Sequence, residues 1–269
     1  MKLQNLIAAL TLPFLVATNS YASAIVDGFN SNSLAANDDG STGLVDIGFS
    51  LNFFDSNFSQ LFVNNNGNIT FESSLSTFSP FDLTSTGQSI IAPFFADVDT
   101  RNGGTVSYGE GSFDGFNAFG VNYIDVAFFG GAGSSNTNTF QLLLVDRSDI
   151  GSGDFDILFN YEQILFETGT ASDGDENGLG GSSARVGFSN GSGDIGTSFE
   201  LTGSAINGAF LDGGVNSLVD NSFNSDIDGR YIFNVRNGSV DFIAEVPAPA
   251  PISILMLVAL AIRCYRKSK

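Results

Sequence analysis

The sequence has no histidine and no tryptophan, and its one cysteine, Cys264, lies close to the C-terminal end. A histidine-dependent catalytic triad, a zinc site built from cysteine and histidine, and an intrachain disulfide are therefore all excluded. Any function of this chain must use oxygen, amide and aromatic groups.

Basic residues are nearly missing from the central part of the chain. Residues 25–245 contain five arginines, no lysine and 29 acidic residues, a net charge of −24. This charge excludes nucleic acid as a partner, because neutralising phosphates requires clustered lysine and arginine. An acidic surface of this kind either attracts divalent cations or keeps the protein soluble by self-repulsion, and the sequence leaves both open.

Helix-favouring patterns are also absent from the central part, which shows no heptads and no amphipathic helix of useful length. The chain is 42% hydrophobic and contains 27 phenylalanines and 32 glycines, a composition suited to short strands joined by tight turns around a sizeable core. Runs of alternating or continuous apolar residues predict strands at 45–53, 60–63, 68–71, 89–96, 104–108, 118–129, 139–145, 154–161, 163–166, 184–188, 230–235 and 240–243. The predicted fold class is all-β, an antiparallel β-sandwich.

Two of these features carry specific expectations. Residues 64–68 read Asn-Asn-Asn-Gly-Asn and predict a hairpin turn, since these residue types tolerate positive φ. Residues 90–96 are apolar on both faces and predict an interior strand. Pro93 cannot donate to a β-ladder, so a bulge or an edge position is expected there.

The N-terminal residues have the pattern of a secretory signal peptide. Lys2 is followed by an apolar run over residues 6–16 and then by the small-residue site Ala22-Ser23-Ala24. Residues 1–24 are predicted to form a signal helix that is removed by cleavage before Ile25. The protein is therefore expected to be exported.

The C-terminal residues end in a short apolar run, 252–262, followed by a basic tail. As a helix this run would span about 16 Å, well short of the ~30 Å hydrocarbon core of a bilayer. Arg263, Arg266 and Lys267 favour a cytoplasmic position for the tail and place the acidic body outside.

The whole segment 246–269 resembles the PEP-CTERM sorting signal, which exosortases process in Gram-negative bacteria. The resemblance rests on Val246-Pro247-x-Pro249, the short apolar helix and the basic tail; Val246 stands where that family has proline, and Ala248 where glutamate is commonest. It implies a processing protease at the membrane as a partner and an initially membrane-tethered protein associated with exopolysaccharide or biofilm. An uncleaved tail anchor is the alternative.

Residues 62–71, 91–101, 139–144 and 159–161 together look like the NIDO domain of nidogen, tectorin and membrane mucins. Residues 178–181, 185–191 and 201–204 resemble the segment that closes this domain in bacterial members. One departure is Phe166, which stands where many members have tryptophan. The resemblance implies an extracellular β-domain over residues 25–245, associated with cell-matrix adhesion and without catalytic residues.

Residues 173–178 match the first six positions of a calcium loop, in which alternating oxygen ligands surround the ion. The candidate ligands are Asp173, Asp175 and Asn177, and Ca²⁺ is the only cofactor that the sequence suggests. Ala184 stands at the twelfth position, where a bidentate glutamate is required, so an acidic solvated loop is the favoured interpretation.

Asp97 and Asp99 lie two residues apart and would project from one face of a strand. They suggest a metal site, a glycosidase pair, or structural hydrogen bonds together with an ion pair to Arg101, and we favour the last.

The sequence therefore predicts an exported, non-enzymatic surface or matrix protein whose partner is an extracellular polymer. An enzyme that acts on extracellular polysaccharide through Asp and Glu carboxylates is the alternative.

Overall fold

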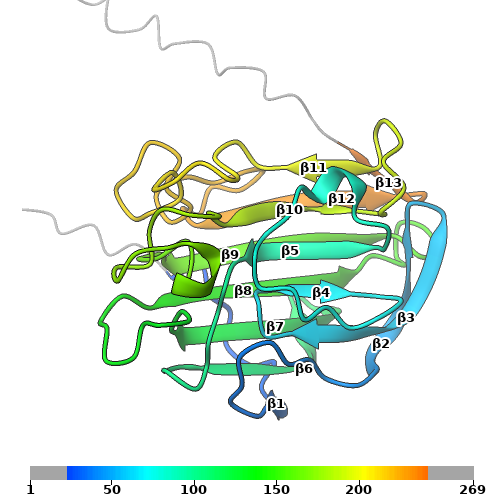
Figure 1. The fold of residues 1–269 in the computed structure, drawn as a ribbon. Helices are drawn as coiled ribbons and strands as arrows, with labels where there is room; N and C mark the ends of the chain where they lie inside the picture. The colour runs from blue at the N-terminus through cyan, green and yellow to red at the C-terminus, as the bar shows by residue number, and fades with distance from the viewer. Residues whose placement is uncertain (1–22, 242–269) are drawn as a thin grey trace, which may run out of the picture.

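The structure is a computed structural model that describes residues 23–241, in which the strands form two antiparallel sheets packed face to face (Figure 1). The larger sheet has seven strands, in the spatial order β1 (Asn32–Leu34), β6 (Thr105–Phe113), β7 (Phe116–Val126), β8 (Asn138–Asp146), β9 (Phe155–Gln163), β12 (Arg230–Arg236) and β13 (Ser239–Asp241). The smaller sheet has six, in the order β11 (Ser198–Glu200), β10 (Arg185–Ser189), β5 (Ile90–Phe95), β4 (Asn68–Thr70), β3 (Ser56–Asn64) and β2 (Val45–Phe53). Two short 3₁₀ helices, η1 (Leu83–Ser85) and η2 (Thr170–Ser172), lie in the connections.

The predicted β-sandwich is confirmed, and most predicted strands coincide with observed ones. The strand predicted at 163–166 is wrong: β9 ends at Gln163, and the following residues leave the sheet to bond to Asn138 and Asp212 instead. The pattern also missed β1 and β11, because three-residue edge strands are too short to show a period. The predicted signal helix and the predicted apolar C-terminal helix lie outside the described residues.

Strand β5 occupies the interior position that its apolar sequence predicts, between β10 and β4, and all six of its residues are buried. The pairing of β5 with β10 is irregular between the partners Phe95/Arg185 and Ala92/Gly187. Over this stretch β5 advances by three residues and β10 by only two. This irregularity contains Pro93, so the expected bulge is confirmed. The carbonyl of Pro93 accepts a 2.6 Å hydrogen bond from the hydroxyl of Tyr161 on the opposite sheet.

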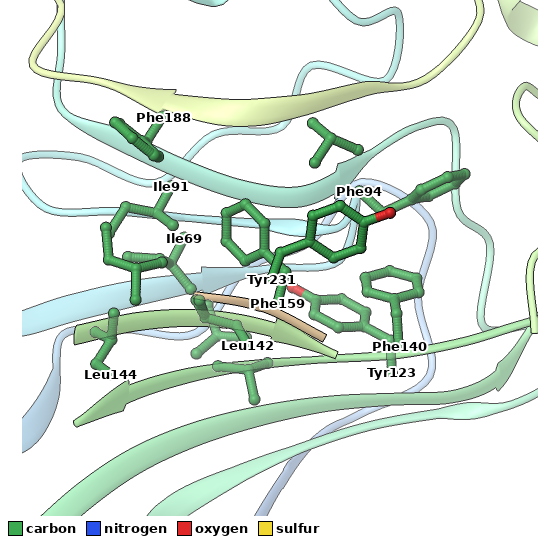
Figure 2. Packing of buried hydrophobic residues seen from close by; sticks show 14 of the residues in the cluster. Ile69, Ile91, Phe94, Tyr123, Phe140, Leu142, Leu144, Phe159, Phe188 and Tyr231 are labelled. Carbon is green, nitrogen blue, oxygen red and sulfur yellow. The ribbon is translucent and has the colours of Figure 1, made fainter. Parts of the chain in front are cut away.

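Aromatic rings fill the space between the sheets (Figure 2). Tyr123 on β7 stacks on Phe140 on β8 with a centroid distance of 4.5 Å, and Phe140 contacts Phe94 on the other sheet at 5.3 Å. Phe166 is fully buried against Phe94 and Phe128, at 6.2 and 5.1 Å. The phenylalanine excess therefore supplies the core, and at the position expected for tryptophan it acts as an apolar plug.

The outer face of the seven-stranded sheet is covered by the N-terminal residues. Phe29 packs on Leu143 and Leu158, and Val26 packs beside it. On the other sheet, residues 71–89 cover the outer face of β5, where Phe95 contacts Phe81. The central strands are apolar on both faces because these segments cover them as a third layer.

Four polar side chains form a ladder across that covered face, one on each of β7, β8, β9 and β12. Each of them lies opposite the next across the sheet and is hydrogen-bonded to it at 2.7–2.9 Å; in order they are Asn122, Gln141, Asn160 and Arg230. Three of them, Asn122, Gln141 and Arg230, also hold the N-terminal segment by donating to its carbonyls, including that of Ala24. Polar residues in the middle of apolar runs are therefore the anchor of the N-terminal segment.

Candidate functional site

Three acidic segments that are distant in sequence meet at the turn between β3 and β4. They are residues 37–41, residues 97–101 directly after β5, and the loop at η2. We describe this region as the candidate site because it combines buried carboxylates with buried amides.

The turn at residues 64–68 is confirmed as a three-residue hairpin loop, with Asn64 opposite Asn68. It is buried, although asparagine-rich turns usually lie on the surface. Gly67 has φ +73°, and a Cβ at this position would overlap the carbonyl oxygen of Phe94. A glycine is needed here because both its left-handed conformation and the approach of β5 exclude a side chain.

The two middle asparagines of the turn connect the acidic segments to each other. Asn65 donates to the carbonyls of Asp38 and Val98 at 2.5 and 2.6 Å. Asn66 donates to Oδ1 of Asp39 at 2.9 Å and accepts a 3.0 Å bond from the amide of Val98. The position of Asp38 and Asp39 relative to β5 is therefore fixed by buried amide hydrogen bonds.

Asp99 pairs with Arg101, as the sequence suggests. Two bonds of 2.9 and 2.8 Å join the guanidinium to the Asp99 carboxylate, and Arg101 also reaches Oδ2 of Asp38 at 2.7 Å. These contacts hold the pKa of Arg101 above its usual range. Asp99 is therefore a structural residue.

Asp97 is in a different environment, so treating the two aspartates as one pair is wrong. Both follow β5 and do not lie within a strand. Asp97 is 1% exposed, and Oδ2 accepts a 3.3 Å bond from the Ser172 hydroxyl, while Oδ1 has no hydrogen-bond partner. Burial raises the pKa of Asp97 to about 7, and the carboxylates of Asp38, Asp39 and Asp99 contribute to the shift. A side chain at Gly169 would collide with this carboxylate, so glycine allows the η2 loop to close over it.

The predicted calcium ligands Asp173, Asp175 and Asn177 lie together in an exposed loop after η2. Oδ1 of Asp175 accepts hydrogen bonds from the amides of Asn177 and Leu179, at 2.8 and 3.0 Å. These bonds lower the pKa of Asp175. The carboxylate therefore stabilises its own loop, and calcium binding there stays a prediction.

The other predicted site residues belong to the signal-cleavage site and the sorting motif, and of these only Ala24 lies within the described residues. Ala24 is buried, and its carbonyl accepts a 2.7 Å bond from Arg230. Ala22 and all the sorting-motif residues lie outside the described residues, namely Val246, Pro247, Pro249, Arg263, Arg266 and Lys267. Over residues 23–241 no helix is long and apolar enough to cross a membrane.

Sequence reasoning did not find Asp38 and Asp39 as site residues. They belong to a short acidic, glycine-containing stretch that reads as an ordinary turn. The one usable signal is the density of amide and carboxylate residues at 64–68 and 97–99, since buried polar groups require partners.

Comparison with known proteins places the chain in a family and identifies alpha-tectorins among its relatives. Residues 59–237 match the nidogen-like domain family. The chain is 35% identical to alpha-tectorin of Gallus gallus and 34% identical to alpha-tectorin of Homo sapiens, in each case over 228 residues. The similarity covers 76% of this chain and 10% of each relative, so the chain spans about a tenth of the length of these proteins. No solved structure matches.

Proposed function

Because the chain belongs to the nidogen-like domain family, we propose that it is an exported, non-enzymatic protein of the cell surface or extracellular matrix. The observation that carries the proposal is the family match over most of the described sandwich. The candidate site supports a non-enzymatic role as well, because most of its polar side chains are used in hydrogen bonds that hold the loops together.

The distribution of charge supports an anionic polymer as the partner, reached through divalent cations. All five arginines of the described residues are already engaged, four of them in ion pairs with carboxylates and Arg230 in the polar ladder. The surface therefore keeps a large acidic excess. Divalent cations that bridge carboxylates of the protein and of an exopolysaccharide would allow two anionic partners to adhere.

A binding assay separates scaffolding from catalysis. Purified full chain is incubated with exopolymer from the producing cells, with and without a chelator, and both retention and new reducing ends are measured. We expect retention that the chelator weakens, with no hydrolysis. Hydrolysis of the polymer without retention would favour the alternative, a polysaccharide-acting enzyme that uses Asp and Glu carboxylates.

We also propose that the C-terminal segment is a PEP-CTERM-type sorting signal, processed by a membrane protease of the exosortase class. The body would then be tethered outside the membrane before processing, with the basic tail in the cytoplasm. Changing Val246, Pro247 and Pro249 together to alanine is expected to abolish C-terminal processing in the native host, as judged by intact mass. The matched control is Pro251→Ala, which removes a proline outside the motif. Unchanged processing of the triple variant would remove the sorting assignment.

For the N-terminal end, the contacts of Ala24 favour a cleavage site two residues earlier than the sequence first suggests. Cleavage before Ile25 would remove the Ala24 carbonyl, one of the two acceptors of the Arg230 guanidinium, and place a new positive charge near it. Cleavage after Ala22 keeps the contact and has Ser20, also a small residue, at the third position before the cut. N-terminal sequencing of the exported protein is expected to start at Ser23, and a start at Ile25 would contradict this assignment.

A further inference from the structure

Three carboxylates converge at the candidate site in a way that the hydrogen bonds do not explain. One oxygen each from Asp38, Asp39 and Asp97 lies within 4.8 Å of the other two, and no other group of three carboxylates in residues 23–241 does this. Arg101 is the cation paired there, and it is shared between Asp38 and Asp99. Four acidic side chains therefore face one basic group.

Asp97 gives an independent reason to expect a ligand. It is 99% buried, one of its carboxylate oxygens lies in the cluster, and Oδ1 has no hydrogen-bond partner. Oδ1 of Asp38 is likewise buried without a partner. A buried carboxylate oxygen that lacks a donor is costly, unless a cation or a proton satisfies it.

We propose that Asp38, Asp39 and Asp97 bind one divalent cation, Ca²⁺ in the extracellular environment. Calcium prefers carboxylate oxygens at 2.3–2.6 Å, and two ligands on opposite sides of the ion are then about 4.8 Å apart. The separations in the cluster fit within this limit. Waters would supply the remaining positions of a six- to eight-coordinate ion.

The proposed site would act as a cross-link. Asp38 and Asp39 lie in the connection from β1 to β2, while Asp97 follows β5 and contacts Ser172 of η2. One ion would thus fasten two segments that lie far apart in the sequence, and η2 would be held to them through the bond from Ser172 to Asp97. Residues 23–241 contain no cysteine, so a cation could provide here the kind of stabilisation that disulfides give other exported proteins.

The site differs from the candidate calcium loop at 173–178, and the proposal goes beyond the proposed matrix function, because it requires no polymer. It can therefore be tested on the protein alone. A failure here would leave the polymer-binding assay unaffected.

The test is thermal unfolding and calorimetric titration of the purified full chain after removal of metal ions, with Ca²⁺ added alone and Mg²⁺ in a parallel series. At a Ca²⁺ concentration 100 times the Kd, we expect the midpoint of unfolding to rise by roughly 5–10 °C. Mg²⁺ should act more weakly, since it requires near-ideal octahedral geometry at about 2.0–2.1 Å.

Three variants locate the ion. Asp97→Asn and Asp39→Asn are expected to lose the Ca²⁺-dependent shift and the calorimetric binding signal, whereas Asp175→Asn in the exposed loop should keep both. Without calcium, Asp97→Asn should unfold at the same temperature as the original protein or higher, because it removes a buried unpaired charge; this also shows that it folds. Asp39 is only partly buried, so Asp39→Asn tests the site with little risk to the fold.

The proposal would be overturned if the original protein showed no calcium-dependent shift, which would mean that a proton satisfies Asp97. It would also be overturned if the shift survived in both Asp97→Asn and Asp39→Asn. Loss of the shift in Asp175→Asn alone would place the ion in the exposed loop instead.

Discussion

Tyr123→Phe tests the connection between the aromatic core and the buried asparagine turn. Tyr123 is fully buried, and its hydroxyl donates to the carbonyls of Asn64 and Asn68 at 2.8 and 3.3 Å. Phenylalanine preserves the ring that stacks on Phe140 and removes only the hydroxyl. The change therefore isolates the bond between the core and the turn.

The expected loss of stability follows from the burial of both the Tyr123 hydroxyl and the carbonyls that accept from it. Removing a donor while its acceptors remain buried costs about 1–3 kcal/mol, because the carbonyl loses its hydrogen bond and gains no water. For a domain of this size, a loss of about 2 kcal/mol lowers the unfolding temperature by roughly 4–8 °C.

The assay is thermal and urea unfolding of the Tyr123→Phe protein next to a Tyr108→Phe control. Tyr108 is half-buried, and its hydroxyl has no hydrogen-bond partner among the described residues, so the control should change stability by less than about 0.5 kcal/mol. Equal stabilities of the two variants would refute the reasoning, since the hydroxyl of Tyr123 would then contribute nothing to holding the turn.

Three further predictions test other parts of the fold. Gly67→Ala should destabilise by about 3 kcal/mol or more in urea unfolding, because alanine would need a left-handed φ and would overlap the Phe94 carbonyl; a loss below 1 kcal/mol would contradict this. Glu167→Gln should cost about 2 kcal/mol and open the chain to chymotrypsin at Phe210, whose amide bonds to the buried Glu167 carboxylate at 2.6 Å, and unchanged proteolysis would argue against it. Burial raises the pKa of Tyr161 well above its usual value, so the folded state keeps a proton that the unfolded chain releases, and stability should fall as pH rises past about 10; absorbance at 295 nm should show Tyr161 ionising only with unfolding.

Much of the fold could be predicted from local pattern. Strand β2 has the predicted bounds, and β5 occupies the interior position with a bulge containing Pro93. These predictions succeed because side-chain alternation and the missing amide of proline act within a single strand. The strand predicted at 163–166 failed for the opposite reason, because bonds to Asn138 and Asp212 remove these apolar residues from the sheet.

The candidate site was predictable only in part. The ion pair of Asp99 with Arg101 is local, since two residues separate the partners, and the sequence suggested it. That Asp38 and Asp39 lie beside Asp97 was not predictable, because they reach it only when the β3–β4 turn is buried and its side-chain amides hold residues 37–41 and 97–101 together.

The sequence by itself determined that the described chain is an all-β sandwich with a phenylalanine core, an acidic surface and no histidine or thiol chemistry. These properties depend on composition and on short-range periodicity, which are complete in the sequence. Only the tertiary structure decided which polar residues are buried, which of two neighbouring aspartates is left without a counter-charge, and which side chains bind the N-terminal segment. Those outcomes depend on register and on the packing of distant segments, where a shift of one residue would place every side chain on the other face of its sheet.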